Sequence, residues 1–381
     1  MTSPLPKDQS MSDPRKIPFF DYPALFAQRK QEYLDIVSDV LARGAYIMQQ
    51  DLLDFETDLA AYLGVKHAIG VADGTMALLT SLMAAGIGEG DEVIVPSHTF
   101  VASAAAVNHV GAKPVLVECA SDHLIDAESA AAVVTSNTRA IMPVQLNGRV
   151  TNMDPVIALA KQHNLQIIED SCQALGAKFD GRFAGTFGTA GTFSFFPAKT
   201  LGCFGDGGAV ITDRDDIADR IRIIRDHGRD PSDGKVKLFG YNSRLDNVQA
   251  AVLSAKLKYY DADIARRRAI AAIYQEQLGS IDSLDLPPAP GSDPRHFDIF
   301  QNYEIEADSR DELRDFLASR GIGTILQWGG YTIHQFEALG LNDDLPYTEA
   351  MTKRFMLLPM HQMLSDDDVN YVCQQIIEFY N

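Results

Sequence analysis

The amino-acid sequence predicts an α/β protein: a large domain with a mostly parallel sheet between helices, followed by a smaller α+β domain at the C-terminus. Three observations support this fold class. Short apolar runs alternate with helix-like segments between residues 66 and 213, a proline-rich segment interrupts the chain at 287–294, and a second pattern of strands and helices follows it. At 381 residues the chain also exceeds the size at which one hydrophobic core usually stops growing.

The domain boundaries follow from these patterns. We assign residues 18–260 to the large domain and residues 261–381 to the small C-terminal domain. Residues 1–17 are polar and rich in proline. We expect this N-terminal segment to be disordered, because it cannot bury enough apolar surface to offset the entropy of ordering.

Strands and helices alternate in the large domain. Five short apolar runs are expected to be buried strands, at 67–71, 92–96, 114–119, 140–144 and 166–169. The segments with helical patterns lie at 75–85, 101–110, 127–134 and 155–163. Asp154 and Pro155 form an N-cap and first-turn pair at the start of the last of these helices. Repetition of strand, helix and strand predicts parallel pairing with helices on both faces of the sheet.

The C-terminal part of the chain has a different pattern. A long, charged helical stretch runs from Leu245 toward Leu278 and ends before the proline-rich segment. Four elements are expected beyond it: a strand over 302–306, a helix opened by a capping box of Ser309 and Glu312, a strand over 324–327, and a terminal helix capped at Ser365. This mixture predicts a small α+β domain.

Composition excludes several classes of function. The chain has 33 Lys and Arg against 52 Asp and Glu, a formal net charge of −19, which disfavours nucleic acid and anionic membranes as partners. The longest nearly apolar run, 76–87, is too short to span a bilayer. The four cysteines are far apart without a C-x-x-C pair, so we expect neither a metal site nor a disulfide framework. The simplest expectation is a cytoplasmic protein with free thiols.

Polar residues follow the predicted strands where ligands bind in open α/β sheets, beyond the carboxyl ends. Asp170 and Gln173 follow one strand, and Phe100 follows another. Gly74 and Thr75 follow a third strand and open a helix, whose free N–H groups can bind an anion. Each residue alone has an ordinary structural alternative: a helix cap, an ion pair or a core side chain.

Lys199 lies between an aromatic run and a cluster of glycines, in the stretch GTFSFFPAKTLGCFGDGG (191–208). It could extend to solvent, pair with Asp206, or take part in chemistry. The sequence contains neither of the usual nucleotide-binding motifs. GIGEGD (86–91) does not have the glycine spacing of the dinucleotide-binding motif, and no P-loop occurs. An anion loop, a strand-end Asp and a downstream Lys suit pyridoxal 5′-phosphate (PLP) instead. This cofactor needs a lysine for a Schiff base, an acid and a phosphate cradle.

The chain resembles the nucleotide-sugar aminotransferases, which are PLP enzymes of the aspartate aminotransferase fold (fold type I), and among them the 4-keto-6-deoxyhexose transaminases. The resemblance extends from about Phe19 to the C-terminus. The motifs that carry it are VADGTMAL (71–78), PSHTFVAS (96–103), IIEDSCQALGA (167–177), TFSFFPAKTLGCFGDGGAVITD (192–213) and GYNSRLDNVQAAVL (240–253).

The resemblance implies roles for individual residues. Lys199 forms the Schiff base (the internal aldimine), Asp170 keeps the pyridine nitrogen protonated, and pyridoxamine 5′-phosphate is the aminated form of the cofactor. The other implied contacts are Gln173 to the phenolic oxygen, Phe100 on the ring face, Gly74, Thr75 and Ser194 around the phosphate, and Asn242 to the phosphate of the neighbouring subunit. A homodimer with shared active sites is therefore implied.

Two segments depart from the commonest family pattern. In PVQLNG (143–148), Gln145 and Asn147 replace a histidine and a tyrosine. In GIGTILQWGGYTIHQF (321–336), Gln327 and Trp328 stand where other members often have H-Y-P, and His334 follows. By resemblance both segments lie near the cofactor or the sugar, so these five residues are candidate substrate contacts.

The implied function is transfer of an amino group from glutamate to a nucleotide-linked 4-keto-6-deoxy sugar, such as dTDP-4-keto-6-deoxyglucose, with ping-pong kinetics. Such a reaction belongs to deoxyamino sugar biosynthesis, for example for lipopolysaccharide O-antigen. Three alternatives remain open: a 3-keto sugar aminotransferase, a PLP-dependent sugar dehydratase, and a non-catalytic PLP-binding regulator. Lys199 argues against the dehydratase, which has histidine at that position.

Overall fold

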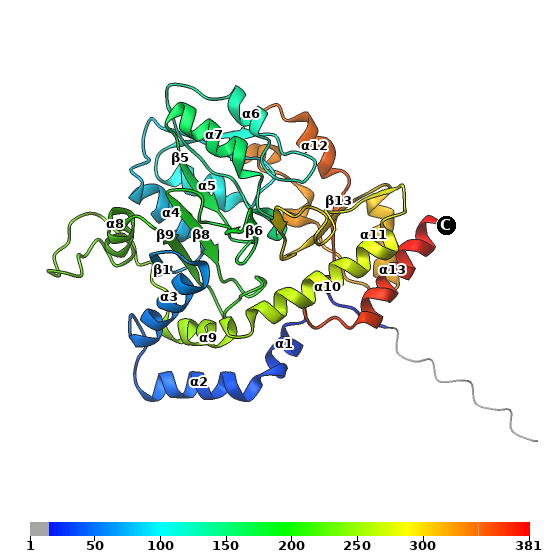
Figure 1. The fold of residues 1–381 in the computed structure, drawn as a ribbon, viewed down its shortest axis with the longest axis horizontal. Coiled ribbons are helices and arrows are strands. Elements are labelled where there is room, and N and C mark those ends of the chain that lie inside the picture. The colour runs from blue at the N-terminus through cyan, green and yellow to red at the C-terminus, as the bar shows by residue number, and fades with distance from the viewer. Residues whose placement is uncertain (1–14, 342) are drawn as a thin grey trace, which may run out of the picture.

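The computed structural model describes residues 15–341 and 343–381 (Figure 1). The disorder expected for residues 1–14 lies outside this part of the chain. Ile17 is buried, and it pairs with Ile322 through backbone hydrogen bonds to Gly321 and Gly323. The expectation of disorder is therefore wrong for residues 15–17, which belong to the folded part.

A seven-stranded sheet forms the centre of the large domain, in the order β1-β9-β8-β5-β4-β2-β3. The strands are β1 (His67–Val71), β2 (Glu92–Pro96), β3 (Lys113–Val117), β4 (Thr138–Ile141), β5 (Gln166–Asp170), β8 (Ala190–Ser194) and β9 (Gly208–Thr212). Only β9 runs antiparallel to its neighbours within this sheet. The predicted fold class, including the mostly parallel sheet, is confirmed.

Helices cover both faces of this sheet (Figure 1). One apolar cluster contains residues of α4 (Gly74–Ala84), α5 (Val101–His109) and α8 (Asp215–Arg225). The opposite cluster contains residues of α3 (Gln50–Leu63), α6 (Ala127–Ala132), α7 (Met153–His163) and α9 (Asn247–Leu257). Alternation along β1 supplies both clusters, with Ala68 on one face and Ile69 on the other.

The start of α7 differs from the sequence prediction. Its N-cap is Asn152, whose side chain accepts a hydrogen bond from the backbone N–H of Asp154. The helix therefore begins at Met153, and Pro155 occupies the third helical position rather than the first. Proline is tolerated there because N–H groups of the first turn have no partner within the helix.

The predicted helical stretch 245–278 is divided into α9 and α10 (Tyr260–Leu278). The first half of α10 packs in the large domain through Tyr260 and Ile264. Its second half packs among residues of the C-terminal part, through Ile270, Tyr274 and Leu278. One continuous helix thus contributes to both cores, and the domain boundary at 260/261 stays a prediction. Helix α2 (Lys30–Ala42) lies beside α9, and the short α1 (Tyr22–Gln28) packs against α2 (Figure 1).

The C-terminal part contains an antiparallel sheet of β10 (Leu284–Asp285), β12 (Tyr303–Ala307) and β13 (Phe355–Leu358), packed with α11 (Arg310–Ser319) and α13 (Asp366–Tyr380). The short α12 (Pro346–Thr352) precedes β13. A third small sheet joins β6 (Lys178–Phe179), β7 (Arg182–Phe183) and β11 (His296–Phe297). The cap expected at Ser365 is confirmed, and Asp368 completes a capping box with it.

Two predicted elements of this part are wrong. Ser309 has left-handed backbone angles (φ 51°) and its side chain makes no capping hydrogen bond, so no capping box opens α11. The strand expected over 324–327 is reduced to a single bridge between Ile325 and Leu357. A 3-10 turn, Gln327–Gly330, follows it, because Trp328 and Gly329 adopt positive φ angles that end extended backbone.

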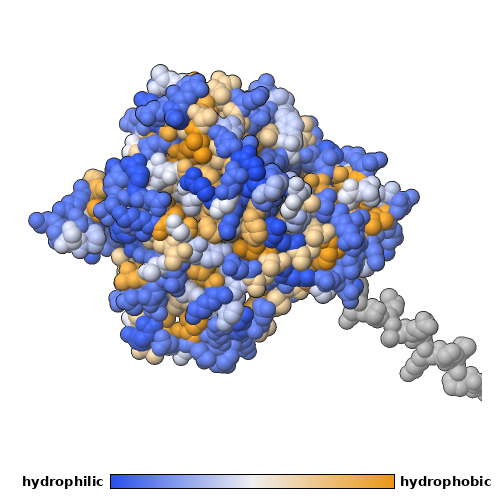
Figure 2. All heavy atoms as spheres, viewed as in Figure 1, coloured by the Kyte–Doolittle hydropathy of each residue, from blue (hydrophilic) through white to orange (hydrophobic). Residues whose placement is uncertain are grey.

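The visible face of the molecule is predominantly hydrophilic, with apolar residues in small groups (Figure 2). In the described part of the chain we find no helix whose length and apolar character would let it cross a membrane.

Candidate active site

The N-terminus of α4 forms one side of the site. The Asp73 carboxylate caps the helix by accepting a hydrogen bond from the backbone N–H of Met76 at 2.8 Å. Gly74 and Thr75, in the first turn, lie opposite Ser194 at the end of β8. A Cβ atom on Gly74 would lie 2.8 Å from the Ser194 Cβ, so only glycine permits this close approach. The result is a narrow cradle of helix N–H groups and one hydroxyl, suited to a phosphate.

Lys199 lies in the turn that follows β8. Its backbone N–H donates to the Phe196 carbonyl, and the turn is tied to Phe195 by hydrogen bonds with Gly207 and Cys203. The Lys199 side chain is mostly enclosed by protein and only partly exposed to solvent. Burial lowers the pKa of its amine, and the nearby Cys172 and Asp170 raise this pKa by a smaller amount. The lowered pKa favours the neutral amine, which is the form that can attack a carbonyl group.

Asp170 ends β5 and is almost fully buried. Its Oδ2 accepts a hydrogen bond from the Ser103 hydroxyl at 2.7 Å, and its Oδ1 accepts one from the backbone N–H of Cys172 at 3.2 Å. These two donors hold a carboxylate in place beside the cavity. Phe100, the N-cap of α5, exposes 52% of its surface, which is unusual for an aromatic residue at a buried strand end.

These groups surround one cavity of about 700 Å³. The predicted residues that line it are Gly74, Thr75, Phe100, Asp170, Gln173, Ser194, Lys199 and Trp328. A phosphate cradle, an exposed aromatic face, a strand-end carboxylate and a lysine of lowered pKa are the groups that PLP requires. The residues present therefore fit this cofactor.

Comparison with known proteins agrees with this geometry. The model of the DegT/DnrJ/EryC1/StrS aminotransferase family matches residues 27–377. The chain belongs to this aminotransferase family. Members of the DegT/DnrJ/EryC1/StrS family are PLP-dependent enzymes of fold type I, so the expected cofactor and enzyme class are confirmed.

Two similar proteins and one similar crystal structure support this family assignment. A "pleiotropic regulatory protein" of Geobacillus stearothermophilus is 39% identical, over 96% of this chain and 98% of its own length. A "dTDP-3-amino-3,4,6-trideoxy-alpha-D-glucose transaminase" of Streptomyces venezuelae is 39% identical, over 92% and 93%. The crystal structure of S. venezuelae DesV in complex with a ketimine intermediate superposes with a TM-score of 0.92 at 37% identity, covering 96% of this chain and 99% of DesV.

Two predicted substrate contacts do not line the cavity of this family member. Gln145 is fully buried: its Nε2 donates to Glu169 at 2.9 Å and its Oε1 accepts from the backbone N–H of Thr151 at 2.7 Å. Its side chain thus helps to satisfy a buried carboxylate instead of facing a substrate. His334 Nδ1 lies 2.7 Å from the Ser97 hydroxyl, also away from the cavity.

The other predicted substrate contacts are divided. Trp328 lines the cavity, and its ring contacts that of His98. Asn147 and Gln327 lie behind the cavity wall, where Gln327 Nε2 donates to the Asn147 Oδ1 at 2.9 Å. Both are polar residues of an internal network, so a contact of either side chain with substrate stays a prediction.

Asn242 does not line the cavity formed by its own chain. It is exposed, in the segment between α8 and α9, where its backbone bridges to Asp226. Phe239 in the same segment is 99% exposed, an unusual position for a large apolar side chain in a monomer. The role of Asn242 in a neighbouring subunit stays a prediction.

Three residues next to the cavity wall were not among the predicted site residues: Glu304, His123 and Asn302. Asn302 Nδ2 is 3.3 Å from the Gln173 Oε1, and Glu304 contacts Asn147. The available signal was the pattern YEIEA in β12, where glutamates alternate with apolar residues on a strand buried on both sides. A buried carboxylate requires partners, and these partners came from distant segments.

Proposed function

We propose that this protein transfers an amino group from glutamate to the ketone of a nucleotide-linked sugar, with Lys199 as the Schiff-base lysine. The single observation that carries the proposal is the meeting of Lys199, Asp170 and the α4 N-terminus around one cavity. When bound there, PLP supplies an electron sink for the electron pair of the broken C–H bond. In this proposal Gly74, Thr75 and Ser194 hold the cofactor phosphate.

The residues of the chain have distinct tasks in this reaction. The Asp170 carboxylate, held by its two donors, would face the pyridine nitrogen of the bound cofactor and keep it protonated. Phe100 would cover one face of the ring, and Gln173 would donate to the phenolic oxygen. Lys199, as a neutral amine, would move the proton of the donor Cα atom, and its lowered pKa supports this task.

Two positions of the substrate ketone are candidates, C4 and C3 of the sugar. The sequence resemblance favours a 4-keto-6-deoxy sugar. The S. venezuelae relative, which is named for a 3-amino sugar, favours a 3-keto sugar. We propose a nucleotide-linked 3-keto or 4-keto deoxy sugar, with the 3-keto form as the first substrate to test because that relative is 39% identical over 92% of this chain.

The proposed reaction is tested with purified protein loaded with PLP. Glutamate should bleach the visible absorption of the Lys199 Schiff base, and a keto sugar should restore it. The panel consists of dTDP-, UDP- and GDP-linked sugars with the ketone at C3 or at C4, with product detected by mass spectrometry. A spectrum unchanged by glutamate and by every other amino acid would contradict an aminotransferase and favour the regulator, the function for which the G. stearothermophilus relative is named.

We further propose a homodimer in which Asn242 completes the phosphate site of the other subunit. Lys199→Ala and Asn242→Ala chains should each be impaired as homodimers, whereas a mixed dimer has one site free of both lesions. Random exchange should therefore recover about a quarter of the wild-type activity. A mixture of Lys199→Ala with Asp170→Asn is the control, because both lesions belong to one chain's cavity and no intact site forms. No recovery in the first mixture despite verified exchange would contradict the shared site.

A further inference from the structure

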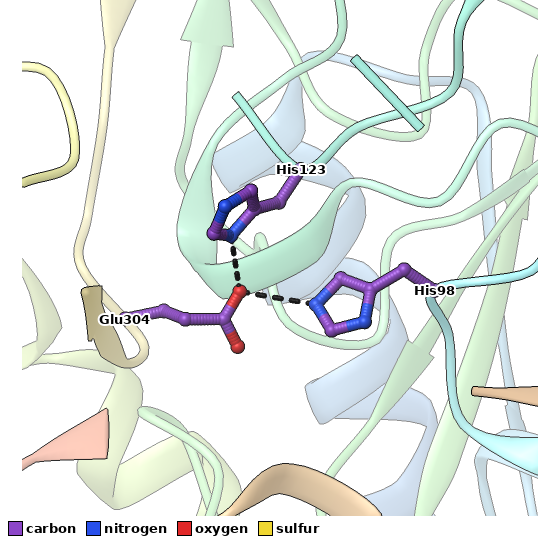
Figure 3. Close-up of side chains that lie close together, drawn as sticks. All are labelled: His98, His123 and Glu304. Carbon is purple, nitrogen blue, oxygen red and sulfur yellow. Dashed lines mark hydrogen bonds and ion pairs between the residues drawn. The ribbon is translucent and has the colours of Figure 1, made fainter. Parts of the chain in front are cut away.

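A buried ionic cluster lies behind the cavity wall (Figure 3). Glu304 Oε1, from β12, lies 3.0 Å from the His98 Nε2 and 2.5 Å from the His123 Nδ1. The other nitrogen of His123 lies 3.1 Å from Glu306. Burial opposes the charge on His123, but the hydrogen bonds and charges of the two glutamates raise its pKa to about 10. Burial would likewise raise the pKa of Glu304, but the two histidines hold it well below its ordinary value. Glu304 is therefore ionised.

The geometry of this cluster is that of hydrogen bonds and not of a metal centre. Both ring nitrogens contact the same carboxylate oxygen directly. Two ligands of a tetrahedral zinc ion, each about 2.0–2.1 Å from the metal, would lie about 3.3 Å apart. The 2.5 Å contact between Glu304 and His123 leaves no such space.

Glu304 also accepts hydrogen bonds from two amide side chains. Asn147 Nδ2 donates to its Oε1 at 3.2 Å, and Gln327 Nε2 donates to its Oε2. An ionised carboxylate can only accept, so each amide must present its nitrogen to it. The Asn147 amide is thereby oriented with its Oδ1 pointing away from Glu304.

Hydrogen bonds connect the oriented Asn147 to Gln173. Asn147 Oδ1 accepts from Asn302 Nδ2 at 2.9 Å, and the same Nδ2 lies 3.3 Å from the Gln173 Oε1. The backbone N–H of Asn147 donates to the Gln173 Oε1 at 2.8 Å. With its oxygen occupied by two donors, Gln173 has only its amide N–H₂ group left for the cavity that it lines.

We propose that Glu304 is a positioning residue, which acts through Asn147 and Asn302 to hold the Gln173 amide as a donor to the phenolic oxygen of the cofactor. The inference rests on the proposed function, in which Gln173 contacts that oxygen. Glu304 itself does not line the cavity. Its four side-chain partners lie on four separate segments, which it ties to β12. Its effect reaches the site through two side chains, Asn147 and Asn302.

The substitution Glu304→Gln tests the relay with little change in volume. All four side-chain partners of Glu304 donate hydrogen bonds: His98, His123, Asn147 and Gln327. A glutamine amide nitrogen would face a donor in either orientation, so the Asn147 amide loses its fixed direction.

The readout is the pH titration of the visible absorption of the PLP-loaded protein. A donor to the phenolate oxygen stabilises that oxygen without its proton, and so lowers the pKa of the adjacent imine nitrogen. Loss of the donor in Glu304→Gln should raise the titration midpoint by about one pH unit. Asn302→Ala, which removes one donor to Gln173 directly, should shift the midpoint in the same direction and serves if Glu304→Gln does not fold.

Glu306→Gln is the matched control, since Glu306 lies on the same strand and contacts His123 and Arg354 but not Asn147. Its midpoint should stay close to that of the wild type. An unshifted midpoint in folded Glu304→Gln and Asn302→Ala proteins, or an equal shift in Glu306→Gln, would overturn the relay while the proposed aminotransferase function stands. A wild-type protein that forms no Schiff base on Lys199 would overturn both.

Discussion

Replacement of Lys199 with alanine should remove the absorption band of the Schiff base with PLP and lower the transamination rate by at least about 10⁴-fold. The amine of Lys199 is enclosed beside Asp170 and the α4 cradle, and burial favours its neutral form. The substitution therefore deletes both the Schiff base and the group that moves the proton. Absorption spectra and single-turnover rates with glutamate measure the two losses separately.

Lys256 provides a matched control for this substitution. It is also largely buried with a lowered pKa, but its Nζ donates to the Gly202 carbonyl and it does not line the candidate active-site cavity. Lys256→Ala should retain the visible absorption. Borohydride reduction followed by peptide mapping should place the pyridoxyl group on Lys199, and its recovery on Lys256 or any other lysine would make the assignment wrong.

Asp170→Asn should lower kcat by about 10³-fold or more while most of the cofactor remains bound. Asparagine has nearly the same volume and can still accept the hydrogen bond of Ser103 or of the Cys172 N–H. What it lacks is the negative charge opposite the pyridine nitrogen, which stabilises the electron pair delocalised into the ring. Each tenfold loss corresponds to about 1.4 kcal/mol.

The measurement pairs kcat with cofactor content after gel filtration. Asp206→Asn is the control, because Asp206 is an exposed carboxylate at the edge of the same cavity. Its kcat should change by less than about tenfold, as expected for a charge screened by solvent. Near-normal kcat in Asp170→Asn would remove Asp170 from the proposed role.

Most of the fold could be predicted because its signals are local. Each strand of the large domain that the sequence analysis proposed is an apolar run, and each is present with shifts of a few residues at its ends. Two predicted elements are wrong because tertiary contacts imposed a backbone conformation different from the one that the local sequence favours. Ser309 and Glu312 have the spacing of a capping box, yet Ser309 adopts a left-handed conformation. The apolar run at 324–327 turns at Trp328 toward the cavity instead of continuing as a strand.

The cofactor, and the residues expected to contact it, could be predicted from the sequence alone. Gly74, Asp170 and Lys199 are each placed by the strand or helix next to them, and parallel strands bring their carboxyl ends to one edge of a sheet. Tertiary contacts alone set the directions of the Gln145, Asn147 and Gln327 side chains and bring the last two to Glu304. The physical reason is that a buried polar side chain turns toward whichever partner satisfies it, and those partners come from segments far apart in the chain.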